Sequence, residues 1–124
     1  MNAFNMAKTA YANSATPTRT PRGIEYDAFA RITHRMKSLS VDKSNFGALT
    51  AALHDNKKLW AILAADVSDS ENTLPDALRG RIFYLYEFTA QHTSKILRKE
   101  ETVDVLVDIN TAVMRGLRSQ AGAL

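Results

Sequence analysis

The stretch Asn56 to Arg79 reads N-K-K-L-W-A-I-L-A-A-D-V-S-D-S-E-N-T-L-P-D-A-L-R and decides the fold. It holds the only tryptophan of the chain, Trp60, near the end of an apolar helical pattern, followed by a polar loop and a proline. Pro75 suits the first turn of a following helix, where its missing N–H costs nothing. The stretch therefore predicts two long helices joined by a short loop, and such helices run antiparallel.

Apolar residues at steps of three and four continue on both sides of this loop. Steps of this size place the residues on one face of a helix, which would pack against neighbouring helices. No long segment alternates apolar and polar residues with a period of two. We therefore expect an all-α fold, a small and mostly antiparallel bundle of four main helices over residues 23–39, 45–67, 75–98 and 102–119.

The first 22 residues differ from this pattern and predict a short helical arm with a linker. Residues 2–13 are weakly amphipathic, with Phe4 and Tyr11 a heptad apart, and two prolines follow within residues 14–22. A helix this short is marginal on its own, so it must pack on the domain, bind a partner or fray. We expect an N-terminal arm and linker over residues 1–22 and a single helical domain over residues 23–124.

The composition fits one soluble domain and excludes several kinds of chemistry. The chain has 124 residues, 45% of them hydrophobic and 23% charged, and no cysteine. Thiol catalysis, thiolate zinc sites and disulfides are therefore excluded. No apolar run approaches the ~20 residues that span a bilayer, and the first 30 residues lack the apolar region of a secretory signal. We expect a cytoplasmic protein without a membrane partner.

Nothing in the sequence indicates an active site, a metal site or a cofactor. His34, His54 and His92 fall on three different predicted helices, and none has the i, i+4 partner of a helical metal site. We expect two of these histidines to be exposed and one to be partly buried. The serines have no histidine or lysine at a recognisable spacing, and no glycine-rich phosphate loop is present. We therefore expect a protein that is not an enzyme.

Asn56 and Asn110 are lone amides within apolar seams. A buried amide without partners costs on the order of 1–3 kcal/mol, so each must be satisfied. Each would bond a helix end, a loop carbonyl or the other amide and so fix helix register, or one of them would meet a partner's backbone. Trp60 also has two interpretations, as a core residue or as a half-exposed platform at the rim of a groove.

The predicted helix over 75–98 carries more aromatic residues than a four-helix core can hide. Tyr84, Tyr86 and Phe88 lie off its apolar seam. Large exposed apolar patches commonly mark sites for protein partners.

Basic residues are concentrated in the N-terminal half. Residues 1–58 hold 9 Lys and Arg against 4 Asp and Glu, whereas residues 59–124 hold 7 against 9. This imbalance is mild and fits a solvated surface, but it also leaves open a contact with nucleic acid. The basic residues that support this alternative are Arg19, Arg22, Arg31, Arg35 and Lys37.

Short motifs in a fixed order give the chain a resemblance to a known family. They are Ala10-Tyr11, Arg22 with Glu25, Asn56-x-x-Leu59-Trp60, Asn72-x-Leu74-Pro75-x-x-Leu78-Arg79, and Asp108-Ile109-Asn110 with Met114, Gly116 and Leu117. In this order and spacing the chain resembles FlaF, a family of flagellar biosynthesis regulators from alphaproteobacteria, over almost its whole length.

The resemblance implies a non-enzymatic regulator of flagellin synthesis and secretion that acts with the regulator FlbT. The expected partners are flagellin or flagellar export components, with a chaperone-like role in binding flagellin. An RNA-binding regulator of flagellin mRNA is the alternative.

A flagellin-binding role leads to a hypothesis about residues. An amphipathic flagellin terminus would enter an apolar groove on the 75–98 helix, and the arm would fill that groove when no flagellin is bound. Asn56, Pro75 and Asn110 are predicted to be structural. The candidate partner-binding residues are Trp60, Leu74, Tyr84, Tyr86 and Phe88 on the domain, with Phe4 and Tyr11 on the arm.

Overall fold

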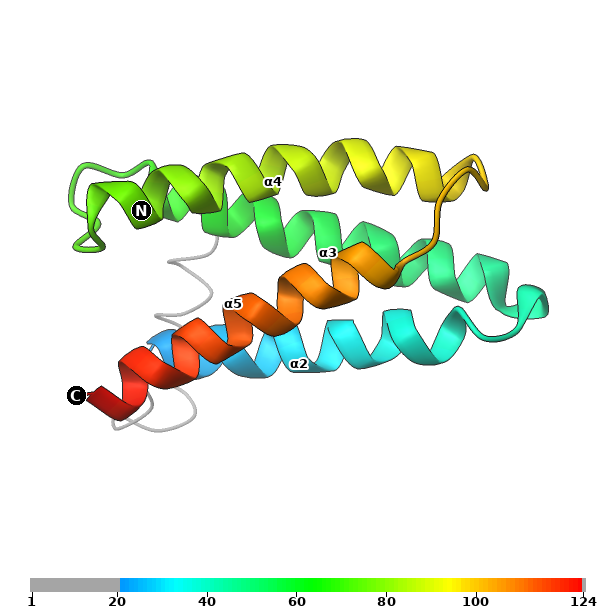
Figure 1. The fold of residues 1–124 in the computed structure, drawn as a ribbon, viewed down its shortest axis with the longest axis horizontal. Helices are drawn as coiled ribbons and strands as arrows, with labels where there is room; N and C mark the ends of the chain where they lie inside the picture. Colours follow the sequence, from blue (N-terminus) through cyan, green and yellow to red (C-terminus); the bar gives the residue numbers. More distant parts are fainter. Residues whose placement is uncertain (1–20, 124) are drawn as a thin grey trace.

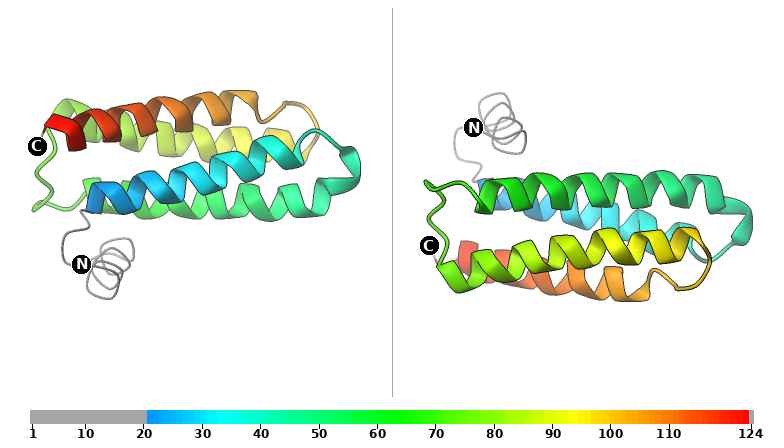
Figure 2. Two further views of the ribbon diagram at one scale, coloured as in Figure 1. Left: turned by 90° about the horizontal axis from the view of Figure 1, so that it is seen from below. Right: turned by 90° about the horizontal axis from the view of Figure 1, so that it is seen from above.

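The computed structural model describes the backbone of residues 21–123 and the side chains of residues 26–116. Within this part the chain forms four α-helices that run up and down as an antiparallel bundle, with a short 3-10 helix before the second (Figures 1 and 2). This confirms the predicted all-α fold. The elements are α2 (Pro21–Leu39), η1 (Lys43–Asn45), α3 (Phe46–Val67), α4 (Asp76–Leu97) and α5 (Asp104–Ala123).

The helix ends lie within a few residues of the predicted ones. α2 begins at Pro21, two residues before the predicted start, and proline suits a first helical turn. α5 continues to Ala123, past the predicted end at residue 119. The predicted arm, with Phe4 and Tyr11, lies outside the described residues.

Short polar loops precede η1 and α4. The carboxylate of Asp42 accepts a hydrogen bond from the Ser44 backbone N–H at 2.9 Å, which caps η1 and lowers the pKa of Asp42. Pro75 stands one residue before α4, in an extended conformation, and its carbonyl accepts the Arg79 N–H at 3.0 Å. Asp76 then opens α4 at the positive end of the helix dipole.

The four helices do not contact one another equally. α2 packs extensively on both α3 and α5, and α3 packs on α4. α4 and α5 are joined by residues 98–103 but diverge from there, and they make few contacts (Figure 1). α4 is therefore held to the bundle mainly through α3.

The apolar core consists of two clusters of buried residues, one toward each end of the bundle. The first contains Phe29, Leu59, Trp60, Leu63, Val67 and Ile82. The second contains Met36, Leu49, Ala52, Leu53, Ile96, Val103 and Leu106.

A layer of buried polar side chains lies between the two clusters. Asn110 on α5 accepts a hydrogen bond from Trp60 Nε1 at 2.9 Å. Its amide nitrogen donates to Asn56 Oδ1 on α3 at 2.8 Å and to Thr33 Oγ1 on α2 at 3.0 Å. Asn56 and Asn110 are completely buried. The two amides therefore bond each other, which was one of the structural roles expected for them.

Trp60 is a core residue, and this corrects its place among the predicted partner-binding residues. Its side chain is fully buried, and its ring meets the ring of Phe29 edge to face at 5.4 Å. The indole N–H, which needs a partner when buried, has one in Asn110.

Two buried polar atoms of the layer have no hydrogen-bond partner. These are Asn56 Nδ2 and Thr89 Oγ1 on α4. Thr89 lies between Ile82 and Ile96, which belong to opposite clusters, so it stands in the layer as Thr33 does. The layer thus reaches all four helices, but its hydrogen bonds connect only α2, α3 and α5.

The two threonines of the layer should respond differently to the loss of their hydroxyl groups. Thr33→Val removes the acceptor of a buried Asn110 N–H and should lower the free energy of unfolding by about 1–3 kcal/mol. Thr89→Val, the matched control, removes a hydroxyl without a partner and should leave it unchanged within about 0.5 kcal/mol or raise it. Urea unfolding followed by circular dichroism measures the free energy of unfolding of both variants. An equal decrease in the two variants would contradict a stabilising hydrogen bond between Asn110 and Thr33.

Candidate partner-binding surface on α4

α4 has polar residues on its buried side and aromatic residues outside. Three of its five buried residues are polar, namely Thr89, His92 and Thr93. Tyr84 is 63% exposed and Phe83 is 41% exposed. The buried side also carries apolar residues, because Ile82 and Ile96 belong to the two core clusters and Leu85 packs on the first, so this side of α4 is mixed in character.

The aromatic side chains of α4 are ordered by contacts with one another and with the core. The rings of Phe83 and Tyr86 meet edge to face at 5.7 Å, and Tyr86 also packs on the first cluster. The ring of Phe88 stacks on His92 at 5.5 Å. His92 Nε2 in turn lies 3.2 Å from the Thr102 carbonyl oxygen, so the stack reaches the loop before α5.

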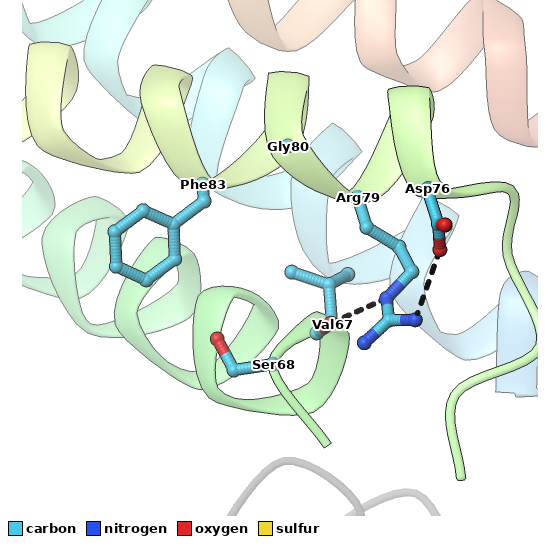
Figure 3. A pocket seen from close by; sticks show the side chains of 6 residues that line it. All are labelled: Val67, Ser68, Asp76, Arg79, Gly80 and Phe83. Atoms are coloured by element: carbon cyan, nitrogen blue, oxygen red, sulfur yellow. Dashed lines mark hydrogen bonds and ion pairs between the residues drawn. The ribbon is translucent and has the colours of Figure 1, made fainter. Parts of the chain in front are cut away.

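A hollow of about 300 Å³ opens between the end of α3 and the first turns of α4 (Figure 3). Phe83 stands at one side of it and the Arg79 side chain at the other. Gly80 leaves room between them, because a Cβ atom there would meet nothing within 4 Å. The other lining residues are Val67, Ser68 and Asp76.

Arg79 fixes the corner between α3 and α4 by binding backbone carbonyls. Its Nε donates to the Val67 carbonyl at 2.7 Å and its Nη2 to the Asp69 carbonyl at 3.2 Å. A cation at a helix C-terminus satisfies carbonyls that lack intrahelical partners and complements the helix dipole. Arg79 Nη1 also lies 3.5 Å from the exposed carboxylate of Asp76.

The loop over residues 68–75 is ordered by Asn72. Its side-chain oxygen accepts the Leu74 N–H at 3.0 Å, and its amide nitrogen donates to Asp66 at 3.4 Å. Leu74 is half-buried and packs on the first cluster. The segment from Asn72 to Arg79 therefore builds the corner that positions the hollow.

The predicted partner-binding residues have different environments. Tyr84 is exposed, Leu74, Tyr86 and Phe88 are half-buried, and Trp60 belongs to the core. Phe4 and Tyr11 lie outside the described residues. Phe83 lines the hollow but was not predicted as a contact, because the seam alone does not show which of the crowded aromatics points outward.

The three histidines of the chain lie among the described residues. His34 and His54 are exposed, and His92 is buried, whereas one histidine was expected to be only partly buried. Among residues 21–123 there is no group of three or more His, Asp or Glu that could hold a metal ion. In the same part of the chain no helix combines the length and the apolar character needed to cross a bilayer.

The family model described as flagellar protein FlaF matches residues 7–117. The match therefore covers the polar layer, the corner and α4, and also residues before the start of α2. No curated protein and no solved structure matches the chain.

Replacing Arg79 should loosen the corner. Arg79→Ala leaves the carbonyls of Val67 and Asp69 without the guanidinium and should lower the free energy of unfolding by about 1–3 kcal/mol. Arg81→Ala removes an exposed arginine two residues along the same helix and should change it by less than about 0.5 kcal/mol. Urea unfolding of the two variants makes the comparison, and equal stability would show that the clamp does not hold the corner.

Proposed function

The chain belongs to the FlaF family of flagellar proteins, and from this premise we propose that it regulates flagellin synthesis and secretion without being an enzyme. It does so as a chaperone-like protein that binds flagellin in the cytoplasm. Flagellar export components and an FlbT-type regulator are further partners in this proposal.

The observation that supports the proposal most is the pair of exposed aromatic residues on α4. Phe83 and Tyr84 lie exposed on a helix whose buried side is rich in threonine and histidine. Exposing aromatic area to water is unfavourable unless a partner covers it, and aromatic residues are the commonest anchors of protein interfaces. The position of the Phe83 ring beside an open hollow fits a partner that inserts a side chain there.

A flagellin terminus has the chemistry that this surface would take. In this proposal the flagellin termini are amphipathic segments that stay unfolded until assembly. An amphipathic helix lays its apolar side chains into a groove at positions i, i+3 or i+4, and i+7. Phe83 and Tyr84 would contact that apolar face, with Tyr86 and Phe88 supporting them from partly buried positions.

The alternative is an RNA-binding regulator of flagellin mRNA. Arg31 and Lys37 on α2 and Lys57 and Lys58 on α3 are exposed, and α2 packs on α3. Arg35, however, forms an ion pair with Asp55 at 2.7 Å, and the exposed aromatic rings lie on α4. RNA-binding modules usually place stacking aromatics beside their basic residues, so this arrangement favours the protein partner.

The aromatic surface can be tested with purified flagellin. The double variant Phe83→Ala/Tyr84→Ala should bind flagellin at least about tenfold more weakly, because aromatic anchors at interface centres are worth about 1.4 kcal/mol or more. Val41→Ala is the matched control, since Val41 is an exposed apolar residue in the loop after α2, and its affinity should equal that of the unchanged chain. Isothermal titration calorimetry measures all three.

Binding to RNA is measured in parallel on the same proteins. Unchanged affinity of the double variant for flagellin would contradict the proposed surface. RNA binding that falls steeply with added salt, together with no flagellin binding, would support the alternative instead.

A further inference from the structure

We propose that residues 1–20 of this chain dock on the corner between α3 and α4 and cover the hollow beside Phe83. The arm would then shield the aromatic surface of α4 until a partner displaces it. The shielding role rests on the proposed function, because it supposes that the partner binds the same surface. The docking itself does not depend on it.

The arm joins the domain at the right place. α2 begins at Pro21, and Figure 1 shows this start at the same end of the bundle as the loop between α3 and α4. Tyr11 is 10 residues before Pro21 (21 − 11), so an extended chain would let it reach up to roughly 33 Å from there. The end of α3 and the first turns of α4 lie at this same end of the bundle, so the hollow is within reach of the arm.

The charges of the arm and of the corner are opposite. Residues 1–20 contain Lys8 and Arg19 and no acidic residue. The corner holds four acidic residues between positions 66 and 76, of which Glu71 and Asp76 are exposed, against one cation, Arg79, whose guanidinium is bound by the Val67 and Asp69 carbonyls. Opposite charges within about 10 Å attract at ordinary salt, so the arm is drawn to this corner rather than to the basic surfaces of α2 and α3.

The hollow also suits the apolar groups of the arm. Phe83 is 41% exposed, Val67 lies at the end of α3, and the empty space above Gly80 would accept a ring. Phe4 and Tyr11 are a heptad apart, so a helical arm would present both on one face. The FlaF model begins at residue 7, which makes most of the arm part of the family pattern rather than an addition to it.

Because the chain has no cysteine, a pair of introduced cysteines reports the docking directly. The full-length variant Tyr11→Cys/Gly80→Cys places one thiol on the arm and one in the hollow. We expect an intramolecular disulfide to form at least about tenfold faster than in the control Tyr11→Cys/Ala112→Cys. Ala112 is exposed on α5, which runs toward the same end of the bundle. Adding Lys8→Glu and Arg19→Glu should reduce the faster rate toward that of the control.

The experiment has clear contrary outcomes. Equal rates for the two cysteine pairs, or a disulfide that joins two molecules instead of one, would overturn the proposal. If Gly80→Cys disturbs α4 by circular dichroism, Tyr11→Cys/Ser68→Cys makes the same comparison from the α3 side of the hollow. No flagellin is present in any of these reactions, so docking of the arm and binding of flagellin are tested separately.

Discussion

The hydrogen bond from Trp60 Nε1 to Asn110 Oδ1 is the contact on which the rest of the bundle depends. Through the same amide, Asn110 also donates to Asn56 and to Thr33, so one side chain of α5 connects to both α3 and α2. Apolar seams alone tolerate a shift of one helix along another, whereas buried polar groups lose free energy unless they meet their partners. The layer therefore sets the level at which the three helices meet, in the way that a buried asparagine sets register in a coiled coil.

α4 takes no part in the hydrogen bonds of the polar layer, and this helps to explain why it exposes aromatic residues. Its residue in the layer, Thr89, has a hydroxyl without a partner, and the helix makes few contacts with α5. What holds α4 is its packing on α3 and the corner that Arg79 and Asn72 build at one end. Its inner side is partly polar, and two of its aromatic residues, Phe83 and Tyr84, lie exposed. A helix that contributes less to the common core is thus the one that offers the apolar surface.

The apolar periodicity predicted the fold class and most helix limits, because residues at steps of three and four continue over nearly the whole length of α3 and α4. The motif from Asn72 to Arg79 could be recognised as a corner, but its mechanism could not. Arg79 binds the backbone carbonyls of Val67 and Asp69, and a sequence pattern of side chains does not show which backbone groups come close to it. From the sequence Trp60 could be a core residue or lie at a groove rim, and its partner Asn110, 50 residues away, places it in the core. The outward direction of Phe83 depends on which side of α4 meets α3, and that is a property of the assembled bundle.

Hydrogen exchange at the indole N–H of Trp60, observed by NMR, tests most directly whether the polar layer organises the bundle. Trp60 is the only tryptophan, so its indole proton gives a single assignable signal. If the indole is locked in the polar layer, its exchange requires global unfolding, and its protection should equal the free energy of unfolding from urea. Exchange at the rate of an exposed indole would show that Trp60 lies at an open rim and that the polar layer does not organise the bundle.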